Sequence, residues 1–203
     1  MAGERVTRAV ILVGGAGRRM GGVDKPLLPL AGHPMLAHII KALTPQIDHI
    51  ALSTGMNPEP YRAFGLPVLP DQQSGTGPLT GLVSALDWAK ADADTLALVP
   101  GDTPFLPLDL IARLVTGRSD KSRAIFAASQ GRVHYSIGLW PLAAADRIAA
   151  YNKNADDRSL AAVARLIGYD QVEWTDEPDP FFNINTPEDW ALAEHRLRAS
   201  HAL

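Results

Sequence analysis

The 203-residue sequence predicts an α/β protein with a mostly parallel sheet and helices on both of its faces. Short apolar runs of strand length alternate along the chain with segments of helical periodicity. A glycine-rich segment also follows the first apolar run directly, at residues 14–22. In folds of this class, ligands bind at the carboxyl ends of the parallel strands, so we expect the functional residues at those ends.

Seven apolar runs have the length of strands and predict the sheet. Short continuous runs of this kind are consistent with strands that are buried on both faces of a sheet. They cover residues 9–13, 49–53, 68–69, 95–99, 124–128, 136–140 and 172–174.

Three segments have apolar residues at i, i+3, i+4 and i+7, the spacing of one face of an α-helix. They are Leu36/Ile39/Ile40/Leu43, Leu79/Leu82/Val83/Leu86 and Leu108/Ile111/Ala112/Val115. A last helix is predicted to begin after Thr186, because a capping hydroxyl is followed by Pro187 and, three residues after the cap, by Asp189. The segment 131–168 interrupts the alternation, and we expect it to be a substrate-facing subregion of a single domain over residues 1–203.

Composition and charge exclude several classes of protein. The net charge of −3 argues against a general nucleic-acid binder, which would carry a basic excess. The absence of cysteine excludes disulfides, thiolate metal sites and thiol nucleophiles. The first residues lack the apolar core of a signal peptide, and no apolar run reaches membrane-spanning length. We therefore expect a cytoplasmic protein with neither nucleic acid nor membrane as a partner.

The segment VGGAGRRMGGVDKPLL, residues 13–28, predicts a loop that binds a triphosphate. Glycines let backbone amides approach phosphate oxygens, and Arg19 and Lys25 supply positive charge. The segment is neither a dinucleotide fingerprint, since Met20 stands at its third glycine, nor a Walker loop, since Gly22 is not followed by lysine. The alternative interpretation is a turn with solvated arginines.

Asp102 is the candidate metal ligand, because it follows the predicted strand 95–99 closely. A carboxylate at the end of a strand suits Mg²⁺, which takes one or two protein oxygens together with phosphates and water. The alternative is that Asp102 only caps the next turn. The histidines lack metal-binding spacing, and the sequence lacks a Gly-x-Ser-x-Gly motif. Metal-assisted phosphoryl chemistry fits this set of residues best.

Four segments in order give the chain a resemblance to the NTP-dependent nucleotidyltransferases, and within them to the molybdenum cofactor guanylyltransferase family. The first begins with LVGGAGRRMGGVDKPLL, and the second joins Pro70-Asp71 to GPLTGL at residues 77–82. The third is PGDTPF at residues 100–105, and the fourth is NINTPED at residues 183–189. Together they extend over nearly the whole chain.

The resemblance implies a three-layer Rossmann-like nucleotidyltransferase fold and transfer of GMP from GTP to the phosphate of molybdenum-molybdopterin. It implies catalytic roles for Arg19, Lys25 and Asp102, with Asp102 holding Mg²⁺. The nucleotide-binding residues that it implies are Leu12, Val13, Gly14, Gly15, Arg19, Lys25, Ser53, Asp71, Pro78, Leu79 and Asp102. The alternatives are a molybdopterin cytidylyltransferase, a sugar-phosphate nucleotidyltransferase and a non-catalytic nucleotide-binding module. We also expect a monomer that makes transient contacts with cofactor-biosynthesis or acceptor proteins.

Asn183, Asn185 and His134 are the candidates for the side of the second substrate, the pterin. The two asparagines alternate on a predicted strand, so their side chains would share a face. Because they lie at the opposite end of the chain from the glycine-rich loop, we expect them to act separately from GTP binding. The alternative for the asparagines is a turn-forming role, and for His134 it is a local hydrogen bond.

Three residues depart from the pattern of the family. Ser53 stands where close relatives place an asparagine toward the base, and Tyr135 replaces a proline. Gly101 replaces the usual cysteine, and we expect that replacement to be silent.

Overall fold

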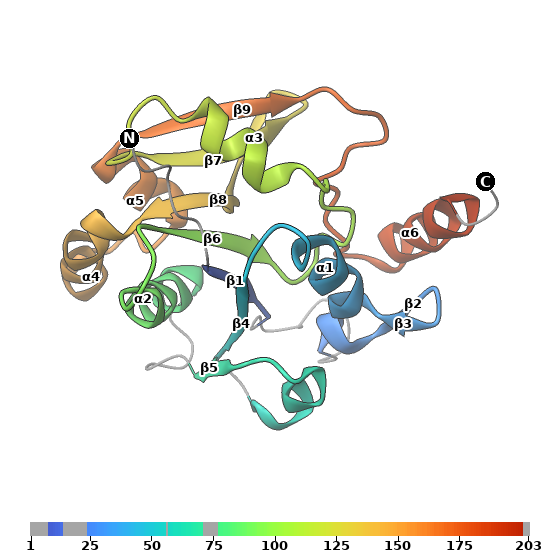
Figure 1. The fold of residues 1–203 in the computed structure, drawn as a ribbon. Coiled ribbons are helices and arrows are strands. Elements are labelled where there is room, and N and C mark those ends of the chain that lie inside the picture. Colours follow the sequence, from blue (N-terminus) through green and yellow to red (C-terminus); the bar gives the residue numbers. More distant parts are fainter. Residues whose placement is uncertain (1–7, 14–23, 56, 71–76, 201–203) are drawn as a thin grey trace.

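A computed structural model describes residues 8–13, 24–55, 57–70 and 77–200 (Figure 1). In this part of the chain, seven strands form one sheet in the order β5-β4-β1-β6-β8-β7-β9. All are parallel to one another except β8, which runs antiparallel to both of its neighbours. Their bounds are β1 (Arg8–Leu12), β4 (His49–Thr54), β5 (Val68–Pro70), β6 (Thr95–Pro100), β7 (Ala124–Ser129), β8 (Arg132–Pro141) and β9 (Tyr169–Trp174). The prediction of a mostly parallel sheet is confirmed.

One face of the sheet is covered by α1 (Met35–Leu43) and α3 (Leu110–Gly117). Side chains alternate along each strand, so every second residue points to this face. Ile11, Leu52 and Val99 from adjacent strands pack here against the apolar sides of the two helices.

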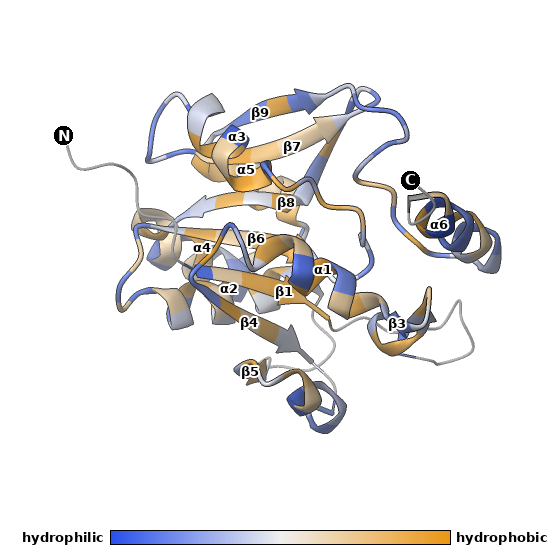
Figure 2. Ribbon diagram, turned by 45° about the vertical axis from the view of Figure 1, so that its right-hand side comes forward, coloured by the Kyte–Doolittle hydropathy of each residue, from blue (hydrophilic) through white to orange (hydrophobic). Residues whose placement is uncertain are grey.

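The other face is covered by α2 (Pro78–Ala89), α4 (Ala145–Asn154) and α5 (Leu160–Ile167). Val10, Leu98 and Phe126 fill this second core. The middle strands are correspondingly apolar, as their orange colour in Figure 2 shows. The helix–sheet–helix arrangement confirms the predicted three-layer fold.

The segment 131–168 supplies both a strand and helices of these layers. It contributes β8 to the interior of the sheet, and the short turn η4 (Leu142–Ala144) leads from β8 into α4 and then α5. Because β8 runs antiparallel, its beginning lies at the same edge of the sheet as the carboxyl end of β6.

A third apolar cluster joins the two ends of the described chain. The helix α6 (Pro187–Ser200) lies beside a two-strand hairpin, β2 (Pro29–Leu30) and β3 (His33–Pro34), at one side of the sheet (Figure 1). Leu30 and Ile184 are buried between these elements, and the backbone N–H of Ala31 donates to Glu194. The C-terminal segment is thereby brought next to residues near the beginning of the chain.

Several boundaries differ from the sequence-based expectations; for example, β9 begins at Tyr169, three residues before its predicted start. Leu108 is 72% exposed and lies outside α3, because a turn in which the N–H of Leu110 donates to Pro107 precedes the helix. β8 begins at Arg132, four residues before its predicted start, since its polar first half pairs with the end of β7. Within the described residues, none of the helices combines the length and the apolar character needed to cross a membrane.

The predicted cap of α6 is confirmed. The side-chain oxygen of Thr186 accepts from the N–H of Asp189, and the Asp189 carboxylate accepts from the N–H groups of Asn185 and Thr186. These reciprocal bonds satisfy donors that a helix N-terminus leaves without intrahelical partners.

Removal of this cap should destabilise the protein. We expect Thr186→Ala to lower the free energy of unfolding by about 1 kcal/mol, the typical effect of losing a capping hydroxyl. Denaturant unfolding measures the difference. Thr44→Ala is a matched control, because the Thr44 hydroxyl donates to a carbonyl at the end of α1 rather than capping an N-terminus. An equal loss in both variants would contradict the prediction.

Candidate active site

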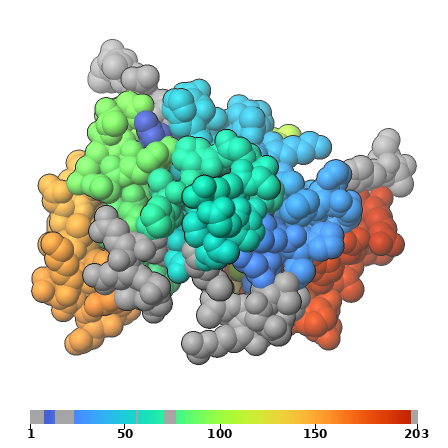
Figure 3. All heavy atoms as spheres, turned by 90° about the horizontal axis from the view of Figure 1, so that it is seen from below, coloured from blue at the N-terminus to red at the C-terminus, as the bar shows by residue number. Residues whose placement is uncertain are grey.

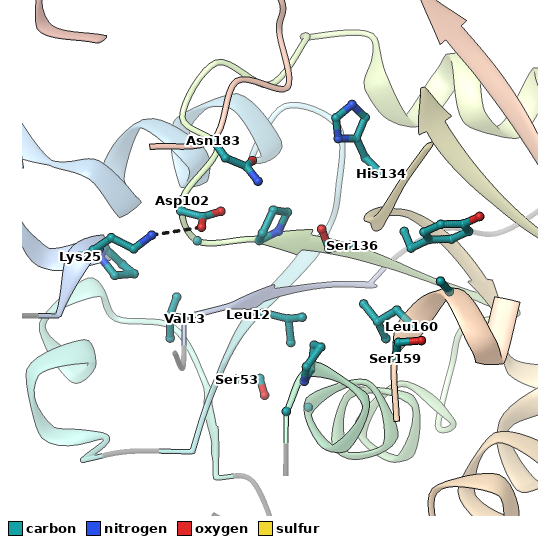
Figure 4. A pocket seen from close by; sticks show the side chains of 18 of the residues that line it. Leu12, Val13, Lys25, Ser53, Asp102, His134, Ser136, Ser159, Leu160 and Asn183 are labelled. Carbon is teal, nitrogen blue, oxygen red and sulfur yellow. Dashed lines mark hydrogen bonds and ion pairs between the residues drawn. The ribbon is translucent and has the colours of Figure 1, made fainter. Parts of the chain in front are cut away.

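A cavity of about 720 Å³ opens at the carboxyl ends of β1, β4 and β6 (Figure 4). The antiparallel strand β8 supplies its opposite wall. The lining residues include Leu12, Val13, Asp24, Lys25, Ser53, Pro78, Gly101, Asp102, Arg132, His134, Ser136, Ser159 and Asn183. The cavity therefore collects residues from widely separated parts of the chain at the edge of the sheet where α/β folds bind their ligands.

Two backbone hydrogen bonds join neighbouring strands at the floor of the cavity, just beyond the ends of β1 and β6. The N–H of Val13 donates to Ser53 O at 2.9 Å, and the N–H of Gly101 donates to Leu12 O at 2.8 Å. A Cβ atom at position 101 would lie 2.9 Å from Leu12 O and 3.2 Å from Pro26 Cγ. A side chain at position 101 would therefore require a small shift of the adjacent backbone, and the expectation that glycine is a silent replacement there stays a prediction.

Lys25 is the most highly bonded side chain of the described site. Its ammonium group donates to Asn185 Oδ1 at 2.9 Å, to Ile184 O at 3.0 Å and to Asp102 Oδ2 at 3.3 Å. An ammonium group has three hydrogens, so these three oxygens use its full donor capacity. Lys25 consequently joins the N-terminal part of the chain to the end of β6 and to the segment before α6.

The two predicted pterin-side asparagines lie in an irregular segment rather than on the expected strand. The backbone N–H of Ile184, between them, donates to Asp102 O, and this bond fixes the segment against the end of β6. Asn183 accepts from the Thr103 hydroxyl and lines the cavity, whereas Asn185 accepts from Lys25. The segment therefore lies in direct contact with Lys25, although the two are far apart in the sequence, and the expectation that it acts separately from GTP binding stays a prediction.

The two carboxylate oxygens of Asp102 differ in their hydrogen bonding. Oδ2 accepts from Lys25, while Oδ1 is buried and lacks a hydrogen-bond partner among the described residues (Figure 4). A buried carboxylate oxygen without a partner is costly unless a cation or donor approaches it. A single oxygen of this kind fits an ion such as Mg²⁺, which takes one or two protein oxygens together with phosphates and water.

His134 lies on β8, on the far wall of the cavity. Its Nε2 atom is 2.8 Å from the Ser129 hydroxyl, and its ring packs against Phe181 with 5.2 Å between the ring centroids. Burial lowers the pKa of His134 below the ordinary value of 6.5, with the charge of Arg132 adding to the effect and Asp179 opposing it. The local hydrogen bond is therefore present, and the predicted contact with a pterin stays a prediction.

The remaining predicted residues fall into three groups. Leu12, Val13, Ser53 and Pro78 line the cavity, and their contact with a nucleotide stays a prediction. The side chain of Leu79 does not line it, since it is fully buried in the core beneath α2. Gly14, Gly15, Arg19 and Asp71 lie outside the described residues.

Several cavity residues were absent from the predicted set, above all those of β8 and the start of α5. Arg132 and Ser136 come from the strand, and Ser159 caps α5 by accepting from the N–H of Ala162 at 3.1 Å. The sequence signal for Ser159 was a hydroxyl residue immediately before an apolar helical run. The signal for Arg132 was weak, because one exposed arginine has no distinctive spacing.

The fold and the cavity define an α/β nucleotidyltransferase, and comparisons with known proteins identify its family. The model of the MobA-like NTP transferase domain matches residues 9–172. The chain belongs to this family and is a nucleotidyltransferase. It is 45% identical over 189 residues to the molybdenum cofactor guanylyltransferase of Acidiphilium cryptum (92% of this chain, 93% of that one). It is likewise 45% identical over 204 residues to that of Rhodopseudomonas palustris (96% and 95%).

Solved structures share the fold at much lower sequence identity. The molybdopterin-guanine dinucleotide biosynthesis protein A of Archaeoglobus fulgidus superposes with a TM-score of 0.76 at 19% identity, covering 95% of this chain and 100% of that one. The 2-C-methyl-D-erythritol 4-phosphate cytidylyltransferase of Thermus thermophilus gives 0.66 at 19% identity, with 93% and 98% covered. Enzymes with different substrates in their names thus share this architecture.

The lowered pKa of His134 predicts a pH dependence of stability. The unfolded chain takes up a proton near pH 6.5, whereas the folded protein takes it up only at lower pH, so stability falls as the pH decreases below about 7. We expect the melting temperature of His134→Asn to fall less steeply between pH 7 and pH 5 than that of the wild type. His49→Asn is the control substitution, because it removes a histidine from an exposed position of the described chain. Parallel curves for His134→Asn and the wild type would refute the assignment.

Proposed function

We propose that this enzyme transfers GMP from GTP to the terminal phosphate of molybdopterin in its molybdenum form and releases pyrophosphate. The observation that carries the proposal is the contact of Lys25 with both Asp102 and the Asn185 segment at one cavity. This contact brings the residues implied in phosphate binding next to those implied in binding the second substrate. The names of the relatives at 45% identity support guanylyl transfer to this cofactor.

The proposed reaction is a direct displacement at phosphorus. An oxygen of the acceptor phosphate attacks the α-phosphorus of GTP and forms the new P–O bond. The bond from that phosphorus to the α–β bridging oxygen breaks, and pyrophosphate leaves with its electron pair. A side-chain base is unnecessary, because a phosphate monoester is already anionic near neutral pH. The work of the protein is to position two anions and to offset their charge.

The described residues divide this work between them. Lys25 can donate to the polyphosphate by exchanging one of its protein oxygens for a phosphate oxygen, which keeps its hydrogens satisfied. Asp102 Oδ1 is the atom that would hold Mg²⁺, and Mg²⁺ when bound supplies positive charge next to phosphate oxygens. Leu12, Val13 and Ser53 form the floor on which the nucleoside would lie.

A different nucleotide or acceptor is the nearest alternative, since the fold is shared with a cytidylyltransferase. Purified protein should release pyrophosphate from GTP when both Mg²⁺ and molybdopterin are supplied, and CTP should be a much poorer donor. Thermal shifts with Mg²⁺ and each of GTP, CTP, UTP and ATP give an independent measure of base preference. Preferential stabilisation by CTP would reverse the assignment, and GTP binding without turnover would favour a non-catalytic module.

Lys25 should matter most for charge stabilisation in the transition state. We expect Lys25→Ala to lower turnover by about two to four orders of magnitude, the scale seen when one preorganised electrostatic contact is lost. The stability should also fall, because Asp102 loses its ion-pair partner and the segment before α6 loses two bonds. Turnover is therefore measured well below the melting temperature of the variant.

Lys90 provides the control for Lys25. It also pairs with carboxylates, those of Asp87 and Asp146, but on the exposed surface away from the cavity. Lys90→Ala should keep normal turnover. Near-normal turnover in Lys25→Ala would rule out its proposed role.

A further inference from the structure

Tyr61 links two parts of the cavity wall through its hydroxyl group. The hydroxyl lies 3.0 Å from Val13 O, at the end of β1, and 2.6 Å from Asp24 Oδ1, in the residue before Lys25. Val13 and Asp24 both line the cavity, and residues 14–23 lie between them in the chain. The hydroxyl thus lies within hydrogen-bond distance of the residue before that segment and of the residue after it.

Tyr61 lies in a short turn whose backbone is fixed by hydrogen bonds. It belongs to η3 (Glu59–Phe64), where the N–H of Glu59 donates to Asn57 and that of Tyr61 donates to Pro58. The turn ends at Gly65, whose φ of +68° favours glycine. In the space-filling view, the region of η3 forms the teal surface in the centre, between α2 in green and the N-terminal hairpin region in blue (Figure 3). The ring of Tyr61 beneath that surface is fully buried.

Tyr61 acts as a hydrogen-bond donor under all ordinary conditions. Burial, together with the adjacent Asp24 carboxylate, raises the pKa of the Tyr61 phenol far above its usual range, so the hydroxyl keeps its proton. A hydroxyl has a single hydrogen to donate, and the charged carboxylate is the stronger of its two acceptors. The Asp24 carboxylate is therefore held by Tyr61, and it does not cap the short helix η2 (Lys25–Leu27) that begins beside it.

We infer that Tyr61 is a positioning residue for the nucleotide: its hydroxyl holds the Asp24 carboxylate beside the end of β1, which sets the place of Lys25 and keeps that carboxylate away from the bound polyphosphate. This inference rests on the proposed binding of GTP in the cavity. An Asp24 side chain released from Tyr61 would be free to approach the Lys25 ammonium or the ligand. Either movement weakens nucleotide binding, because a carboxylate repels phosphate and competes with it for the lysine.

The test measures binding of GTP with Mg²⁺ to the purified full chain by calorimetry. We expect Tyr61→Phe to raise the Kd by at least about tenfold, the scale of one hydrogen bond to a charged group. In turnover assays, the KM for GTP should rise by a similar factor, while turnover at saturating GTP changes by less than about threefold. Tyr151→Phe is the matched control, since it removes a tyrosine hydroxyl that donates to a backbone carbonyl, that of Asp157. Its Kd should equal that of the wild type.

A second substitution separates the positioning role from a general structural one. Asp24→Asn removes the charge that Tyr61 restrains, so the double variant Tyr61→Phe/Asp24→Asn should bind GTP several-fold more tightly than Tyr61→Phe alone. A double variant that binds no better than Tyr61→Phe would overturn the inference, as would normal GTP binding by Tyr61→Phe. Failure of the wild-type protein itself to bind GTP would overturn the proposed function, and this inference with it.

Discussion

Three oxygens from two distant parts of the chain surround the ammonium group of Lys25, and the arrangement of the site depends on this contact. Asp102 Oδ2 comes from the end of β6, and the other two oxygens belong to Ile184 and Asn185 before α6. Two of these oxygens are neutral, so one cation bonds to one oxygen of the Asp102 carboxylate and also anchors a neutral segment beside it. The side chain of Lys25 is only 18% exposed, so solvent screens this charge pair less than it would a surface pair.

The direction of β8 has an equally large consequence for the cavity. Were β8 parallel to β6, its beginning would lie at the opposite edge of the sheet, and His134 and Arg132 would be far from Asp102. The antiparallel pairing of the second half of β8 with β6 instead carries the first half of β8 past the carboxyl end of β6, where it pairs with the end of β7. One wall of the cavity is thus built from parallel strand ends and the other from a strand of opposite direction, with Asp102 between them.

The local features of the fold were predictable because they depend on residues close together in the sequence. The strands β1, β4 and β6 follow from short apolar runs, and the cap of α6 from the spacing of Thr186 and Asp189. The early start predicted for α3 was wrong, because the apolar spacing includes Leu108 although the turn at Pro107 excludes it from the helix. Apolar periodicity says which residues face a core, but it does not say where a turn gives way to a helix.

The sequence by itself determined the class of fold, the place of Asp102 after a strand and the presence of a glycine-rich segment after the first apolar run, since each depends on local pattern. Only the tertiary structure decided that Lys25 contacts Asn185, which is 160 positions away, that Tyr61 holds Asp24, and that a side chain at position 101 would require a small shift of the adjacent backbone. Such contacts depend on the order, direction and register of strands and on the path of the connecting segments. Hydrogen bonds and close packing act over a few ångströms in space, whatever the separation along the chain, so no local pattern encodes them.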